Sequence, residues 1–148
     1  MRWPHPWTLL AMAACSAPAP AADGRDTPPV VVTGAFVYTP ITAAQAAGYL
    51  VLHNRASVPD TVQSVEVDWA NHASIHQTSE TDGMVRMSHL ERLVVGARDS
   101  VVLEPGGIHL MFMDLSRLPV AGDTVELTLQ LARGGRILVA AAVRPYGQ

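Results

Sequence analysis

Two histidines and two methionines, His76, Met87, His109 and Met111, are the residues in this sequence whose side chains best suit a shared metal ion. Neutral imidazole nitrogen and thioether sulfur are borderline and soft donors, and the ion that favours both is copper, Cu(I) above all. Zinc prefers cysteine, histidine and carboxylate ligands, so the methionines point away from it. Only the histidines of such a site exchange protons, and capture of the ion is therefore expected to weaken below about pH 6.

The segment 106–113 (GGIHLMFM) predicts how two of these side chains are oriented. Alternate residues of a β-strand share a face, so His109, Met111 and Met113 are expected on one face and the intervening Leu and Phe on the other. An apolar second face identifies that side as core. On this strand alone, the methionines could equally be adaptable core fillers, with His109 making an ordinary hydrogen bond.

The other two candidates lie on either side of a predicted turn. His76 ends a strand-like stretch, Asp82-Gly83 is a turn pair that tolerates positive φ, and Met87 follows it. Such a turn brings the flanking segments together, so His76 and Met87 are expected to meet. His89 can share the face of Met87, but we assign it to packing or solvation.

The elements that must position these residues are short segments rich in Val, Leu and Ile, separated by Gly, Pro, Asn and Asp. No window carries a helical stripe. Seven or more short strands at near-regular spacing predict an all-β sandwich or small barrel. The expected strands are 30–38, 47–54, 62–69, 73–78, 84–90, 100–103, 109–115, 125–132 and 136–143.

The spacing of the four candidate ligands resembles the copper motif of the periplasmic PCu(A)C-type copper chaperones. Ten residues separate His76 from Met87, and twenty-one separate Met87 from His109, which is followed by Leu and Met111. Segments 46–50, 103–111 and 125–129 are similar to that family's second strand, its L.PGG.H.M block and a late strand. The resemblance extends over most of residues 32–143.

The resemblance implies a cupredoxin-like antiparallel β-sandwich of Greek-key type, with His76, Met87, His109 and Met111 as the ligands of Cu(I). It further implies a metallochaperone that passes copper on by ligand exchange. The expected partner is the CuA subunit of cytochrome c oxidase, whose assembly it would serve, or another copper chaperone. Met84 and Met113 are candidates for additional ligands, and His72 for a second, weaker site.

Composition excludes several other classes of function. The formal net charge is −3 and no lysine is present, whereas a nucleic-acid partner would need a basic stripe. The single cysteine, Cys15, precedes the expected domain, so a blue-copper centre, which requires a thiolate, is not predicted. No nucleophile motif indicates an enzyme. The alternative that stays open is a copper-independent β-sandwich that serves as a binding or structural module.

The N-terminus predicts export. Residues 1–22 have the short apolar stretch and small residues of a signal segment, too short to anchor the chain by spanning a bilayer. Residues 12–15 (MAAC) resemble a bacterial lipobox, which would leave a lipidated Cys15 as a membrane tether in the periplasm; ordinary cleavage near Ala21 is the other route. Residues 16–29 are expected to form a flexible Pro/Ala-rich tether, and 30–145 the copper-binding domain.

Overall fold

A computed structural model describes residues 29–146 of the chain. The predicted signal segment (1–22), Cys15 and nearly all of the predicted tether lie outside the described residues. Within them the chain forms ten strands and no helix, so no helix is present there that could cross a bilayer. The strands are β1 (Val30–Tyr38), β2 (Gln45–Asn54), β3 (Asp60–Glu66), β4 (Ala70–Thr81), β5 (Met84–Leu90), β6 (Leu93–Val95), β7 (Ser100–Leu103), β8 (Ile108–Leu115), β9 (Thr124–Leu131) and β10 (Arg136–Arg144).

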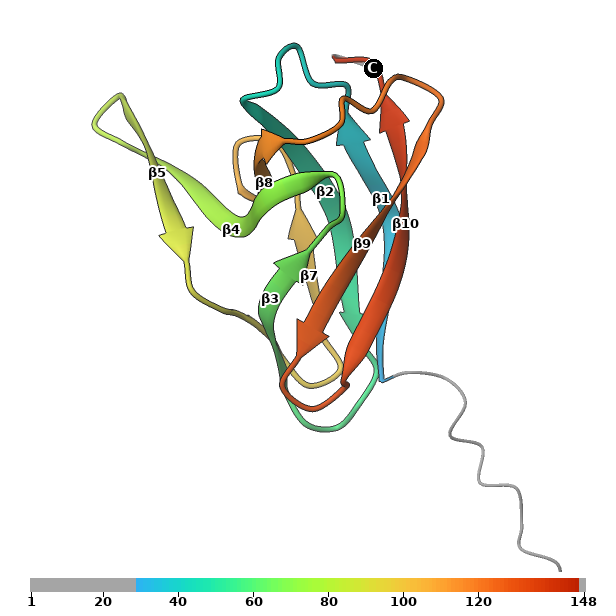
Figure 1. The fold of residues 1–148 in the computed structure, drawn as a ribbon. Coiled ribbons are helices and arrows are strands. Elements are labelled where there is room, and N and C mark those ends of the chain that lie inside the picture. Colours follow the sequence, from blue (N-terminus) through green and yellow to red (C-terminus); the bar gives the residue numbers. More distant parts are fainter. Residues whose placement is uncertain (1–28, 147–148) are drawn as a thin grey trace, which may run out of the picture.

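The strands hydrogen-bond in the order β5-β4-β8-β2-β1-β10-β9-β3-β6, and β7 pairs with β2. All pairs are antiparallel except β1–β10, which is parallel. Strands from both ends of this path contribute to one hydrophobic core, so the sheet closes into a sandwich (Figure 1). The all-β sandwich predicted from the sequence is therefore confirmed.

Strand β8 runs through the middle of this core. Leu110 and Phe112 are fully buried, and the ring of Phe112 packs 4.6 Å from that of Trp69, centroid to centroid. On the neighbouring strand β2, Gly48 leaves room for this ring, because a Cβ there would lie 2.8 Å from Cε2 of Phe112. Packing on the core face thus fixes which side chains β8 presents on its other face.

Several expected strand bounds differ from those in the structure. The strand predicted to reach Trp69 ends at Glu66, because the carbonyl oxygen of Trp69 accepts hydrogen bonds from the amides of Ser116 and Arg117 instead of joining a ladder. Strand β6 was not predicted, since three residues are too few to show a period. The hairpin β4–β5 is longer than expected and extends away from the sandwich (Figure 1).

Candidate metal centre

Strand β8 presents His109 and Met111 on the face opposite to its core side. They are 5% and 9% exposed. On the neighbouring strand β4, His76 lies directly across from His109, and Ser74 lies across from Met111. Because residues paired across strands share a face, His76 lies on the same face as the two β8 candidates.

The hairpin β4–β5 adds Met87 to this face. Its turn contains Asp82 at φ 54° and Gly83 at φ 74°, as the Asp-Gly pair predicts. The register places Met87 across from Thr78, two residues after His76 on β4. Met87 is 53% exposed, so this candidate ligand is accessible to solvent while those on β8 are not.

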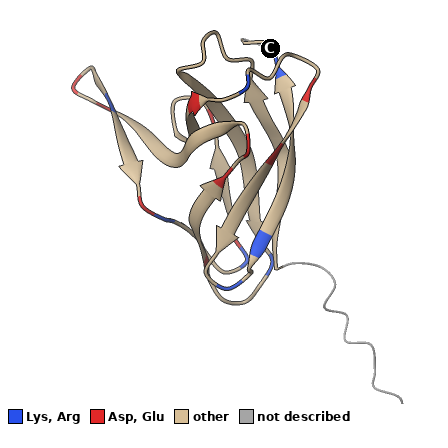
Figure 2. Cartoon of the chain, in the orientation of Figure 1, with Lys and Arg blue, Asp and Glu red and all other residues tan. Residues whose placement is uncertain are grey.

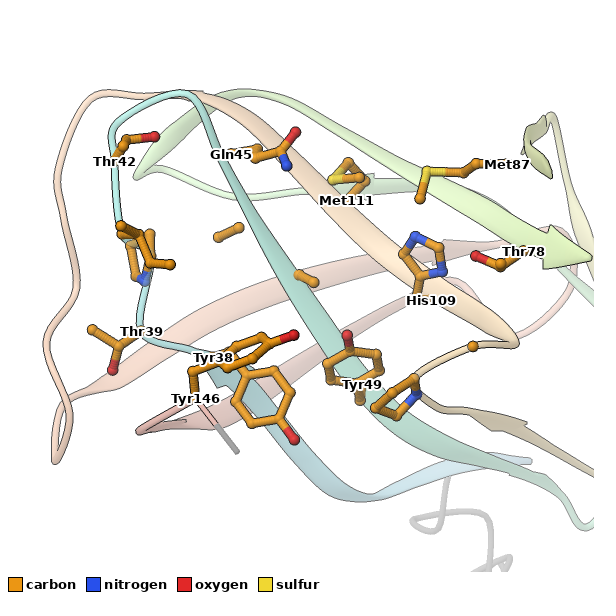
Figure 3. Close-up of a pocket in the computed structure, with 16 residues that line it drawn as sticks. Tyr38, Thr39, Thr42, Gln45, Tyr49, Thr78, Met87, His109, Met111 and Tyr146 are labelled. Carbon is orange, nitrogen blue, oxygen red and sulfur yellow. The ribbon is translucent and has the colours of Figure 1, made fainter. Parts of the chain in front are cut away.

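Met87, His109 and Met111 line one cavity of about 440 Å³, and their side chains converge on the same space (Figure 3). His76 does not line the cavity but lies beside it, with its ring centroid 6.0 Å from that of His109. The structure therefore gathers all four sequence-predicted residues on one face. Among the residues that the structure describes, no Asp, Glu, Lys or Arg lines the cavity.

His109 is held in a defined tautomer. Its Nδ1 lies 3.1 Å from the carbonyl oxygen of Gly107, and a carbonyl can only accept, so Nδ1 carries the proton. The lone pair is then on Nε2 and free for a metal ion, in the usual arrangement for a histidine ligand. The tight turn at Gly106, with φ 81°, positions the carbonyl group of Gly107. The same carbonyl oxygen also accepts a hydrogen bond from the amide of Thr78 at 3.0 Å.

His76 has a nitrogen without a partner. Its Nδ1 is buried and makes no hydrogen bond within the described part of the chain. Burial, followed by the nearby His109 and His89, lowers the pKa of His76 below its ordinary value. The imidazole is therefore neutral near pH 7, and a metal ion would satisfy its orphaned nitrogen.

The donor set fits a soft metal ion and little else. Within residues 29–146, no three His, Cys, Asp or Glu side chains gather closely enough to hold an ion. Any site here thus depends on the two thioethers, which bind Cu(I) well and zinc poorly. The residues present therefore suit Cu(I).

The additional candidates are placed differently. Met84 is on the opposite face of β5 from Met87, since alternate residues change sides. Met113 shares the face of Met111 but lies two residues further along β8 from His109, where it pairs with His72. His72 is exposed and lies 3.8 Å from Asp114. None of these side chains lines the cavity.

Sequence reasoning set aside His89, which lies directly across from His76 with its ring 5.6 Å away. The alternation of side chains along β5 was the available signal, because His89 is two residues from Met87. By contrast, His53 was expected to be a surface or hydrogen-bonded residue, and it bonds Thr33 and Ser100 at 2.8 Å each.

Aromatic rings form the far wall of the cavity and were not predicted. Tyr38 lies 5.5 Å from Tyr49 and 5.1 Å from Tyr146, centroid to centroid. Burial, then the nearby Tyr38 and Tyr146, raises the pKa of Tyr49, so its hydroxyl stays protonated. Charged residues of both signs are scattered along the described chain (Figure 2).

Comparison with known proteins gives one family and several solved structures. Residues 30–143 match the family model described as LpqE-like lipoprotein. The Cu(I)-bound solution structure of DR1885 from Deinococcus radiodurans is 29% identical, with a TM-score of 0.67 over 86% of this chain and 85% of that chain. Its apo form is 29% identical, with a TM-score of 0.62 over 98% of both chains.

The copper-bound PCuAC domain from PmoF2 is 20% identical, with a TM-score of 0.68 over 79% of this chain and 93% of that domain. At that identity the likeness demonstrates a shared fold only. No curated protein sequence matches the chain.

Proposed function

We propose a function from one premise: this chain belongs to the LpqE-like family. The family match and the likeness to PCuAC domains also confirm the resemblance inferred from the sequence. We infer that the protein is an exported metallochaperone, which binds Cu(I) as its cargo and passes it on by ligand exchange. Its role is binding and transport, not catalysis.

The observation that carries this proposal is the meeting of His76, Met87, His109 and Met111 on one face. Two imidazoles and two thioethers from three strands make a donor set typical of Cu(I). The Cu(I)-bound structure of the similar DR1885 supports the same choice of ion. We propose these four side chains as the ligands, with His109 binding through Nε2.

Ligand exchange requires that an acceptor can displace the donor's ligands one at a time. Met87 is exposed on the edge strand β5, whereas His109 and Met111 are buried on β8. We propose that an acceptor first displaces Met87 and that the β8 ligands leave last. The cavity is lined by the exposed Met87 and by no charged side chain of the described residues, and it leaves room for the acceptor's own ligands.

The proposed setting is the periplasm. A family described as lipoproteins supports export and a lipid anchor at Cys15, which would keep the carrier at the membrane surface. The proposed acceptor is the CuA subunit of cytochrome c oxidase, or another copper chaperone in that assembly route.

An anaerobic competition titration with a Cu(I) chelator tests the function. We expect one Cu(I) per wild-type chain and a loss of affinity of about 100-fold or more in His109→Ala and Met111→Ala, since each removes a direct ligand. Met84→Ala, on the opposite face of the hairpin, is the matched control and should bind as the wild type does. Unchanged affinity in both ligand variants would refute the proposed site, and no Cu(I) binding by the wild type would leave the copper-independent binding module as the better account.

A further inference from the structure

Three histidines form a row across three adjacent strands of the described sheet. His89 on β5 lies directly across from His76 on β4, and His76 lies directly across from His109 on β8. Their ring centroids are 5.6 Å and 6.0 Å apart. His76 therefore has an imidazole neighbour at a similar distance on each side.

These separations suit a shared metal ion. A histidine nitrogen binds at about 2 Å, which places the ring centroid about 3 Å from the ion, so two rings on one ion lie about 5–6 Å apart. Both neighbouring pairs in the row fall in this range. His76 can accordingly share an ion with His109 or with His89.

Strand β5 offers two different donors on this one face. Met87 and His89 are both exposed, and because they are two residues apart they point the same way from β5, whose only sheet neighbour among the described strands is β4. As the side chains stand, no three His, Cys, Asp or Glu residues within 29–146 gather tightly enough for an ion. One ion bound by all three rings therefore requires His89 to rotate toward the ion that His76 and His109 share, which an exposed side chain on an edge strand can do.

We propose that the row His89–His76–His109 binds Cu(II), with His89 taking the place that Met87 has for Cu(I). Cu(II) prefers imidazole nitrogen in a tetragonal arrangement, whereas thioether sulfur favours Cu(I). The inference rests on the proposed copper site and extends it to the second oxidation state. Exchange of one β5 ligand then suffices to hold either ion, while the buried β8 strand stays unchanged.

The test uses the full copper-free chain titrated with Cu(II) against glycine as competitor, with electron paramagnetic resonance to count coupled nitrogens. We expect the wild type to bind one Cu(II) with three imidazole nitrogens. His89→Ala should lose one nitrogen and about tenfold or more in Cu(II) affinity, while its Cu(I) affinity stays within about threefold. Met87→Ala should lose Cu(I) affinity and keep its Cu(II) affinity and its nitrogen coupling.

His72→Ala is the matched control, because His72 lies on the same face of β4, next to Asp114 and outside the row. It should leave both affinities unchanged. If His89→Ala binds Cu(II) as the wild type does, with the same nitrogen coupling, the inference is overturned although the Cu(I) site stands. If His109→Ala and Met111→Ala keep full Cu(I) affinity, the proposed function itself fails.

Discussion

Strand β8 and the hairpin β4–β5 each contribute two of the four candidate ligands, but the two regions are held in different ways. β8 lies between β4 and β2, and its residues from His109 to Phe112 are all buried. Within residues 29–146, β5 pairs with β4 alone, and every residue of β5 except Leu90 is exposed. One half of the site is thus built into the core, and the other half is carried on the edge of the sheet.

This difference has a physical consequence for a carrier. Buried, well-packed strands open only with global unfolding, whereas edge elements with few apolar contacts open locally at much lower free energy. A site shared between them can keep a defined geometry at His109 and Met111 while Met87 moves. That combination suits a protein that must hold an ion and also release it.

The largest expected effect is a difference in the free energy of unfolding between a variant on β8 and a variant on β5. Phe112→Ala removes a fully buried ring that packs on Trp69, and we expect it to lower the free energy of unfolding by about 3–5 kcal/mol. Val85 on β5 is 70% exposed, so Val85→Ala should cost less than about 0.5 kcal/mol. Denaturant unfolding of the copper-free protein measures both. Similar losses in the two variants would remove the distinction between core and edge.

A smaller effect tests how closely β2 and β8 pack. In Gly48→Ala the new Cβ would meet Cε2 of Phe112 at 2.8 Å, so the ring must shift, at a cost of about 1–3 kcal/mol. Gly107→Ala is the matched control, since its nearest atom would be Cγ of Glu104 at 3.5 Å and its φ is not positive. Equal stability of the two variants would show that the face of β8 is less tightly fixed than we describe.

The smallest expected effect is the contribution of His76 to the pH dependence of the free energy of unfolding. Its pKa is lowered in the folded protein, so well above pH 6.5 the residue is neutral in both states and contributes nothing to the pH dependence. Below pH 6.5 the unfolded chain binds a proton that folded His76 resists, and the free energy of unfolding falls. We expect this fall to be shallower in His76→Gln, by less than about 1 kcal/mol because the ring is only partly buried. Identical pH profiles between pH 7 and pH 5 would contradict the burial of His76.

Much of the local structure was predictable from the sequence. Strands 30–38, 84–90 and 100–103 were predicted to the residue, because each lies between clear turn or breaker residues. The shared face of His109 and Met111 followed from alternation along the strand. The Asp82-Gly83 turn predicted that Met87 would return toward His76, and the hairpin register places Met87 across from Thr78, two residues after His76.

The rest depended on pairing between segments far apart in the sequence. The parallel pairing of β1 with β10 and the tyrosine wall of the cavity join residues such as Tyr38 and Tyr146, for which no local period exists. His89 was a different case, because alternation placed it on the face of Met87. Only the register of β5 against β4 showed that it lies across from His76.

The most direct test of the central claim observes the methionines individually. In protein labelled with ¹³C at the methionine methyl groups, one equivalent of Cu(I) should shift the signals of Met87 and Met111 together, because copper binds their sulfur atoms. Met84, on the opposite face of the same hairpin, should not shift. If Cu(I) binds and leaves either Met87 or Met111 unmoved, a site that spans the core strand and the edge hairpin is ruled out.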